Sequence, residues 1–559
     1  MSKPFVIRDP VHGYLSVAAH ERLVVDHPIT QRLRRITQTG LAEFVFPEAR
    51  SSRFVHSLGA MHLASRFLIS AVENADERAA SAFFDELEKL DLFKNYSIGL
   101  DDLETLLVPD RRFGGGGLMA NKVCFHDERF RNDRKFVRLL GLAESGLRLA
   151  ALFHDLGHLP FSHDFEFALK DYVGQTPSPS EKLRSLAAGS PHETIGHQLA
   201  HLVFLGLVQD DKTITPAVRA SFAMARRILD SQPGYDDFPN PNVDALGWLH
   251  SLVDGEIDVD RADYLLRDGR ALGLEFASYD LDRLIHNLVL ARHRTYGFVT
   301  AIDERGLTAV ESFYISRARS HQVLVRHHKC AQLCASLRYA SVVALQSDSG
   351  QRFIGELLAL VEGGTTREKA GDLLKRFAEH DDPWWLGVLR QSEAAGDDEN
   401  ALSKATSDLV LRRQPTVRSL WKRKGDLSAD AVAKLNGIVD APELGESVQN
   451  ARRRLEKEGV ILILHRFRPY GVSLGGDPNQ DSIALIRSGK HLRPVVQLSP
   501  LIRSLRDAWR EDPHVHGFAV KGAQTSKDRV LRALLGLGNV LGNVKEPKKQ
   551  PRARRKPGN

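Results

Sequence analysis

Two histidines and two aspartates, spread over three segments, are of types that suit a metal-assisted reaction. His56 stands in SSRFVHSLG, the neighbours His154 and Asp155 stand in ALFHDLGH, and Asp260 stands in EIDVDRADYLLRD. Two imidazoles and two carboxylates suit a divalent transition metal, which can acidify water and draw charge from a phosphate. We therefore expect a hydrolytic centre with His56, His154, Asp155 and Asp260 as metal ligands, for manganese, iron, magnesium or zinc.

The run HDLGHLPFSH strengthens this expectation. It places three histidines and one aspartate in an otherwise apolar stretch, where such side chains are costly to bury unless they are paired or metal-bound. Glu166 lies three residues beyond His163, and His192 opens another predicted helix next to Glu193. A carboxylate that orients a histidine is a common source of a general acid or base. In a chain with 23 histidines, an isolated His-Asp pair would more often be a coincidence.

The segment that begins at Asp260 predicts one wall of a site. Asp260, Tyr264 and either Arg267 or Asp268 share one helical face by their spacing. The alternative is that this helical face is exposed to solvent and that the neighbouring leucines are buried. Arg53 and Arg261 each lie close in sequence to a predicted metal ligand, where cations would spread the charge of a polyphosphate. The alternative for both is an ordinary surface arginine.

Apolar periodicity and turn residues predict a mainly α fold. A turn with a short strand or a hairpin is expected over Arg8–Val17, and strands are expected over Gly459–Val472 and Asp481–Gly489. Expected helical stretches are Pro28–Gly40, His56–Val72, Arg148–Leu169 with a break at Pro160, His192–Val208, Leu246–Gly273 with an internal loop, and Leu307–Leu345. We predict a helical domain over 1–345 with an insertion at 75–147, a smaller α+β region over 346–543, and a flexible tail over 544–559.

Charge and composition limit the classes of function. The net charge of +6 arises in the tail, which has seven basic residues and one acidic residue, whereas the first 543 residues have 70 of each sign. A body built to bind long nucleic acid usually has a basic excess. Three sparse cysteines argue against a disulfide framework, and no apolar run would cross a membrane. A cytoplasmic enzyme fits these features.

The ordered motifs resemble those of the HD-domain deoxynucleotide triphosphohydrolases. They are DPVHGY, QRLRRITQTG, FVFPEARSSRFVHSLG, HDLGHLPFSH, HE and DVDRADYLLRD. The resemblance is dense over Phe5–Val72 and Leu147–Gly273 and looser over Leu307–Leu345. Within this family, the likeness is closer to the vertebrate enzyme that carries a sterile alpha motif ahead of its HD domain, and to its bacterial relatives. That extra motif is not expected here, and the resemblance implies an HD-domain helical core.

The resemblance also implies roles for individual residues. His192 would be the catalytic histidine with Glu166 as its partner, and His158 and His163 would be further active-site histidines. Phosphate contacts would come from Arg53, Arg261 and Tyr264, and contacts to the deoxyribose 3′-hydroxyl from Gln38 and Asp268. The implied reaction hydrolyses a deoxynucleoside triphosphate to a deoxynucleoside and intact triphosphate.

Control by a nucleotide activator is a further implication of the resemblance. In DHPITQRLRR, Asp26 corresponds to a residue that reads a base, and Arg32 and Arg34 correspond to residues that hold phosphates. Such allosteric sites lie between subunits, so a homo-oligomer, either a dimer or a tetramer, is expected. The alternative for the arginines is a solvated helix face.

Two rival functions remain open. An HD-type nuclease or phosphodiesterase, acting on nucleic acid or on cyclic or oligomeric nucleotides, would use the same metal site. A non-catalytic nucleotide-sensing protein is the second rival, although it would not need the full set of ligands together with His192. The basic tail over 544–559 could bind nucleic acid in a salt-dependent way, bind other anionic partners, or serve only as a solvated tail.

Overall fold

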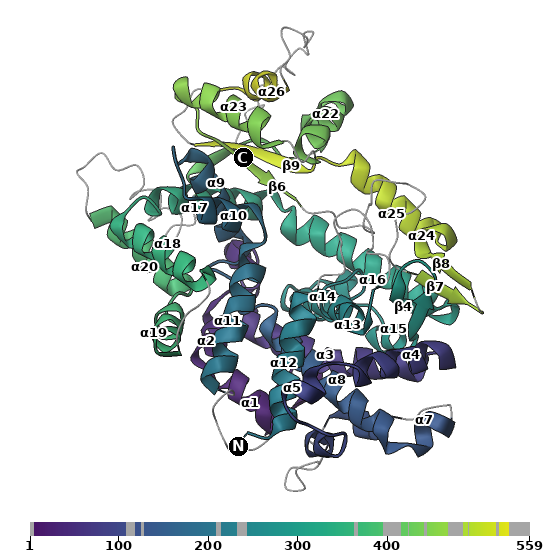
Figure 1. The fold of residues 1–559 in the computed structure, drawn as a ribbon. Coiled ribbons are helices and arrows are strands. Elements are labelled where there is room, and N and C mark those ends of the chain that lie inside the picture. Colours follow the sequence, from purple (N-terminus) through teal and green to yellow (C-terminus); the bar gives the residue numbers. More distant parts are fainter. Residues whose placement is uncertain are drawn as a thin grey trace, which may run out of the picture.

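Helices dominate the computed structural model (Figure 1). The structure describes residues 5–107, 118–123, 128–207, 214–231, 243–362, 367–394, 415–422, 424–440, 444–467, 485–489, 491–520 and 525–535. The expected mainly α fold, an HD-type helical core with a smaller α+β region, is confirmed. The basic tail lies outside the described residues. Among the described helices, none combines the length and apolarity that crossing a bilayer requires.

Two long helices, α3 (Arg53–Glu73) and α8 (Arg134–Phe153), pack against each other at the centre of the core. Most side chains of α3 are buried on every side, which explains why its sequence has no continuous polar face. α12 (Pro216–Asp230) packs on α8, and α14 (Val259–Ala271) packs on α3. The ligands that the sequence predicted on separate segments therefore come from neighbouring helices.

Two glycines allow the close approaches that build the site. A Cβ atom at Gly59 of α3 would lie 1.9 Å from Oδ1 of Asp263 on α14. A Cβ atom at Gly157, in the loop after α8, would lie 1.9 Å from the carbonyl oxygen of His192. Any side chain at either position would push apart the segments that carry the predicted catalytic and metal-binding residues.

In segment 75–147, predicted as an insertion, the described residues are largely helical. It contains α4 (Glu77–Glu88), α5 (Leu92–Asn95), α6 (Glu104–Leu107), α7 (Glu128–Asn132) and the beginning of α8. Its buried apolar side chains belong to the same core cluster as those of α3. α8 thus begins well before Arg148, where the sequence pattern had indicated a helix. The other helices of this half are α1 (Ala19–Val25), α9 (His163–Gln175), α10 (Glu181–Ala188), α11 (Pro191–Leu207), α13 (Ala245–Val253) and α15 (Leu281–His286).

The expected helix from Pro28 to Gly40 is shorter than predicted. α2 ends at Arg32 (Pro28–Arg32), and a 3₁₀ turn follows at Leu33–Arg35. Thr37 then forms an isolated β-bridge with Ser52, and Gly40 has a left-handed φ of 55°. Pairing with the segment before α3 therefore replaces the last helical turn. The expected hairpin is confirmed as β1 (Phe5–Asp9) and β2 (Gly13–Val17).

The long run Leu307–Leu345 forms two helices around a π-helical turn at His321–Val325. They are α16 (Leu307–Ser320) and α17 (His328–Ala344). Figure 1 shows the helices that follow, α18 (Asp348–Val361), α19 (Arg367–Phe377) and α20 (Asp382–Ala394), grouped on one side of the molecule. α20 packs against α17, so it joins the core that carries the site.

Two small sheets make up the β structure of the later part of the chain. One has the order β3-β4-β7-β8 and the other has the order β5-β9-β6. The strands are β3 (Leu288–His293), β4 (Gly297–Asp303), β5 (Val417–Trp421), β6 (Leu462–Arg466), β7 (Leu485–Ser488), β8 (His491–Pro494) and β9 (Val515–Val520). The remaining helices are α22 (Ala429–Asp440), α23 (Leu444–Lys457), α24 (Val495–Leu498), α25 (Pro500–Glu511) and α26 (Lys527–Leu535). β6 and β7 lie within the two predicted strand segments, whose other parts fall partly outside the described residues.

Candidate functional site

The predicted metal ligands meet where α3, the end of α8 and the beginning of α14 come together. Nε2 of His56 lies 2.9 Å from Oδ1 of Asp260, and Nε2 of His154 lies 3.9 Å from the same oxygen. His56, His154 and Asp260 offer ligand atoms within 4.8 Å of one another. Asp155 borders this group, because its oxygens lie 3.6 Å from Nε2 of His56 and 3.4 Å from Nε2 of His154.

The second nitrogen of each histidine is already engaged, which fits metal binding. Nδ1 of His154 lies 2.7 Å from the carbonyl oxygen of Ala151, and Nδ1 of His56 lies 2.8 Å from Oδ2 of Asp263. A ring that donates through Nδ1 presents the lone pair of Nε2. Neither buried Nε2 atom has a partner in hydrogen-bonding geometry among the described residues. Their donor set of imidazole and carboxylate therefore fits a divalent ion.

The carboxylates around His56 favour a positive charge at this point. Burial alone would lower the pKa of His56, but Asp260, Asp263 and Asp155 raise it to about 10. Carboxylates gathered around a buried ring can be balanced by a proton or by a metal ion. A bound cation would supply that balance at the point where the two Nε2 atoms meet.

Asp263 holds His56 in place and is itself held on both sides. Its Oδ1 lies 2.7 Å from Nε2 of His12, and Arg267 donates to both of its oxygens, at 2.8 Å and 2.9 Å. Arg267 also donates to Asp9, over 2.8 Å. The sequence analysis had placed Arg267 as one choice for the wall of the site. In the structure, Asp268 forms part of that wall. Arg267 instead lies behind the candidate metal ligands, where it pairs with Asp263.

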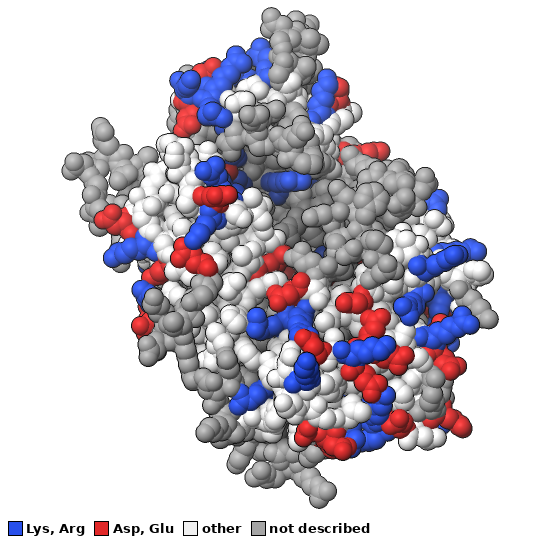
Figure 2. Space-filling view, in the orientation of Figure 1, with Lys and Arg blue, Asp and Glu red and all other residues white. Residues whose placement is uncertain are grey.

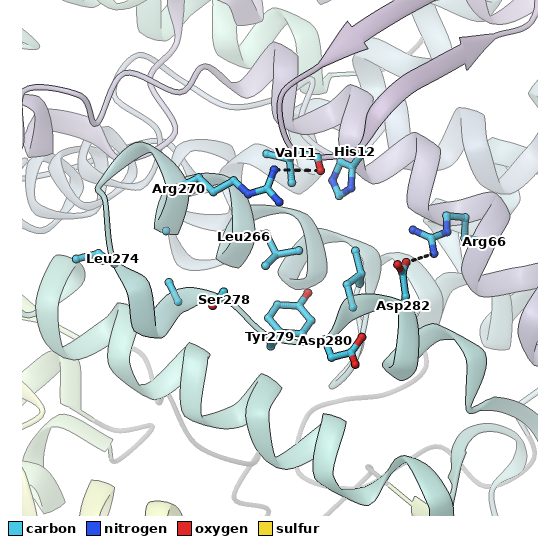
Figure 3. Close-up of a pocket in the computed structure, with 13 residues that line it drawn as sticks. Val11, His12, Arg66, Leu266, Arg270, Leu274, Ser278, Tyr279, Asp280 and Asp282 are labelled. Atoms are coloured by element: carbon cyan, nitrogen blue, oxygen red, sulfur yellow. Dashed lines mark hydrogen bonds and ion pairs between the residues drawn. The ribbon is translucent and has the colours of Figure 1, made fainter.

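A cavity of about 370 Å³ is lined by residues of α14, the β1–β2 turn and the segment that leads into α15 (Figure 3). His12 lines it and also contacts Asp263. Arg270 donates to backbone carbonyls in the turn of the β1–β2 hairpin, and Arg66 pairs with Asp282 over 2.5 Å. His12 therefore both lines this cavity and contacts Asp263, the carboxylate that orients His56.

Replacing Asp263 with asparagine should weaken metal binding. Asp263→Asn removes the charge that orients His56, and loss of such a supporting carboxylate typically weakens metal affinity by about 10–100-fold. The dissociation constant for Mn²⁺, measured by chelator competition, checks this expectation. Asp9→Asn is the matched control, because it weakens the other ion pair of Arg267 without touching His56. Equal affinities in the two variants would contradict the orienting role of Asp263.

Beside the metal centre, four predicted catalytic residues form a second cluster. Nδ1 of His192 lies 2.6 Å from Oε1 of Glu166, and Nδ1 of His163 lies 3.1 Å from Oε2. The His158 and His192 rings stack with centroids 4.5 Å apart. Nε2 of His158 lies 3.0 Å from Oδ1 of Asp155, so His158 joins the two clusters.

The environment of this second cluster gives its members different protonation states. Burial alone would lower the pKa of His192, but the charge of Glu166 raises it above the ordinary value. Burial alone would raise the pKa of Glu166, but His192 and His163 hold it well below its usual range. Burial and the charge of Arg53 hold the pKa of His158 well below normal. The arrangement favours a protonated His192 beside a neutral His158, which suits a proton donor.

A cavity of about 310 Å³ opens next to both clusters. All five predicted substrate-binding residues line it: Gln38, Arg53, Arg261, Tyr264 and Asp268. Arg53 donates to Asp155 over 3.0 Å, and burial raises the pKa of Asp268 to about 7. Oε1 of Gln38 and Oδ1 of Asp268 are buried and have no hydrogen-bond partner among the described residues. The cavity thus combines cationic groups with acceptors for a hydroxyl or amino group.

The sequence analysis missed several residues that line this cavity. They are Asp164 and Phe167 on α9, Arg317 on α16, Cys330 and Cys334 on α17, and His465 and Arg466 on β6. Only Asp164 and Phe167 stand close to a recognised motif. The others come from α16 and α17, where the resemblance is looser, and from β6, whose sequence gave no sign that it would reach the site.

The predicted allosteric residues do not line this cavity. Asp26 pairs with Arg22 over 2.9 Å, and Arg34 donates to Gln31 over 2.7 Å. Arg32 requires a correction, because it is fully buried. Its guanidinium donates to the carbonyls of His380, Leu156 and His158. In the described structure, Arg32 therefore holds backbone segments together. Its side chain has no exposed surface that could contact a phosphate.

Comparison with known proteins gives distant relatives, and no family model matches the chain. The chain is 29% identical, over 48% of its length, to the deoxynucleoside triphosphate triphosphohydrolase SAMHD1 homolog of Dictyostelium discoideum, 36% of which is covered. It is 21% identical, over 57% of its length, to a protein of Acanthamoeba polyphaga mimivirus named for an HD domain, 53% of which is covered. A phosphohydrolase structure from Bacteroides thetaiotaomicron has a TM-score of 0.50 at 19% identity, covering 93% of this chain and 100% of that one.

These matches cover only part of each curated relative. The chain spans about half the length, or less, of the curated relatives it matches. The structural likeness, at 19% identity, shows the fold alone. Four of the relatives, at 21–29% identity, are named as an HD-domain protein or as SAMHD1 triphosphohydrolases, and this chain is similar to them over about half of its length.

Proposed function

We propose that this chain is a metal-dependent phosphohydrolase that converts deoxynucleoside triphosphates to deoxynucleosides and triphosphate. The observation that carries the proposal is one cavity lined both by Asp260 of the candidate metal ligands and by His163, which contacts Glu166 in the second cluster. The names of the SAMHD1 relatives support the choice of substrate. A volume of about 310 Å³ lies within the usual range for small-molecule sites, roughly 300–1,000 Å³.

A divalent ion held by His56, His154, Asp155 and Asp260 would supply Lewis-acid chemistry at the phosphate. The chain's own residues then have separate tasks. Arg53, Arg261 and Tyr264 bind the phosphates, and Gln38 and Asp268 contact the sugar 3′-hydroxyl. Protonated His192 gives its proton to the departing oxygen, while Glu166 keeps the ring oriented and charged. His158 and His163 complete the wall around the reacting phosphate.

The charge distribution favours a free nucleotide over long nucleic acid. On the face shown in Figure 2, basic and acidic side chains are interspersed across the described surface. The first 543 residues contain equal numbers of the two kinds. A protein that follows a nucleic-acid backbone usually presents a basic stripe. A homo-oligomer and activation by a bound nucleotide belong to the same proposal.

Product analysis tests the proposal. The four deoxynucleoside triphosphates are supplied singly and as mixtures with Mn²⁺, and the products are separated by chromatography. Deoxynucleoside and triphosphate should appear together in equal amounts. Activity that appears only in mixtures would indicate a nucleotide activator. An absence of products in every mixture would reject the proposal. Single-stranded nucleic acid and cyclic nucleotides would then be tested, and inactivity towards these too would leave a nucleotide-sensing role.

A further inference from the structure

Two consecutive residues between His158 and His163 have a left-handed backbone. The φ angles of Phe161 and Ser162 are 59° and 56°, and neither residue is glycine. Residues with a Cβ atom avoid this region unless their surroundings hold them there. Both residues are buried. Contacts that hold this turn therefore also set the direction in which the chain enters α9, where His163 and Glu166 lie.

The carboxylate of Asp382, at the beginning of α20, is one such contact. Its Oδ1 accepts the backbone N–H of Phe161 over 2.6 Å. Its Oδ2 accepts the backbone N–H of Thr37 over 2.9 Å and the hydroxyl of Thr37 over 2.8 Å. Asp382 is 5% exposed, so these three donors stabilise a buried carboxylate that meets little solvent.

Both segments that Asp382 joins lead directly into the candidate site. Thr37 precedes Gln38 in the cavity wall, and its carbonyl accepts the hydroxyl of Ser162 over 3.0 Å. The Ser162 oxygen in turn accepts from Nε of Arg53 over 3.1 Å. The carboxylate of Asp382 thus lies behind the cavity, where the Thr37–Gln38 segment meets the Phe161–Ser162 turn.

The beginning of α20 is itself firmly anchored. Arg32 donates to the carbonyl of His380 over 2.9 Å, and the same guanidinium holds the carbonyl of His158 over 2.9 Å. The fully buried Trp385 packs its ring edge-on against Phe165, with centroids 4.8 Å apart. Because this helix end is fixed relative to α9, the carboxylate of Asp382 is a stable reference for the turn.

We propose that Asp382 is a positioning residue of the active site, which holds the Phe161–Ser162 turn and the Thr37–Gln38 segment in their functional arrangement. It acts through Phe161 and Thr37 and does not itself touch the substrate. Only the turnover measurement below rests on the proposed function. The exchange measurement does not depend on which substrate the enzyme uses.

The test is Asp382→Asn, studied in the full chain. The amide turns one acceptor into a donor that faces the N–H groups of Phe161 or Thr37. Hydrogen–deuterium exchange should become faster in peptides that contain residues 156–163 and 36–38, while other peptides and the metal content stay unchanged. Turnover should fall by about 10²-fold, the loss that a displacement of about 1 Å produces, with a smaller change in KM.

Two controls separate positioning from general stability. Asp381→Asn alters the adjacent carboxylate, which contacts Arg35 and the N–H of Trp384 but not the turn, and should leave exchange at 156–163 unchanged. Thr37→Ser retains the hydroxyl that donates to Asp382, whereas Thr37→Val removes it, so turnover should survive only in the serine variant.

Unchanged local exchange in Asp382→Asn would overturn the proposal, as would faster exchange throughout the chain with loss of metal. A wild-type enzyme without triphosphohydrolase activity would reject the proposed function, and the exchange result would still decide the role of Asp382.

Discussion

His154→Ala should abolish metal binding and reduce hydrolysis by about 10³-fold or more while the protein remains folded. A divalent ion contributes several kcal/mol of charge stabilisation to phosphoryl chemistry, and about 4 kcal/mol corresponds to roughly 10³ in rate. His154 is suited to this test because it is only partly buried, and its recorded hydrogen bond is to the carbonyl of Ala151 within the same helical turn. Its removal therefore disturbs little besides the ligand set.

The measurement combines metal content after gel filtration, determined by mass spectrometry, with turnover and the thermal unfolding midpoint. His293→Ala is the matched control, since this last residue of β3 stacks on Tyr296 and belongs to neither cluster. The control should bind metal and turn over as the wild type does. Normal activity in His154→Ala, with or without bound metal, would show that the assignment of the metal centre is mistaken.

His192→Ala should have the second largest effect, a loss of about 10²–10⁴-fold in turnover with metal content unchanged. This range is typical for removal of a general acid or base. His192 lies in the second cluster, apart from the ligand group of His56, His154 and Asp260, and it contacts Glu166, Glu193 and the neighbouring histidine rings. Metal analysis and steady-state kinetics check the prediction together. Unchanged turnover would remove His192 from the mechanism, and lost metal would make it a ligand instead.

The pH dependence of Glu166→Gln provides a finer check on the same pair. Protonated His192 is the acid form, so activity is present below its pKa and is lost as the pH rises through it. In the wild type, Glu166 raises that pKa above 6.5. Glutamine removes the negative charge that raises the pKa of His192, whereas the burial that lowers this pKa remains, so the pKa should fall. The alkaline limb of the kcat profile should therefore move to lower pH, and an unmoved limb would contradict the role of Glu166.

Much of the architecture could be predicted because it depends on local patterns. The apolar residues of His56–Val72 indicate a buried helix, and Pro160 marks the break between α8 and α9. The metal-binding and histidine clusters could also be anticipated, since HDLGHLPFSH concentrates costly polar groups in an apolar stretch. The helix expected to reach Gly40 failed for a non-local reason, because the β-bridge between Thr37 and Ser52 competes with the last helical turn.

The amino-acid sequence was sufficient to identify the histidines, carboxylates and arginines that gather in the two clusters and along the cavity. Only tertiary structure revealed that Asp263 orients His56 from behind, that Arg32 is buried, and that Asp382 joins residues 37 and 161. Helical periodicity reports which face of a segment is apolar, but not which distant segment covers it. The supports of this site are hydrogen bonds between residues more than a hundred positions apart, so they exist only once the helices have packed.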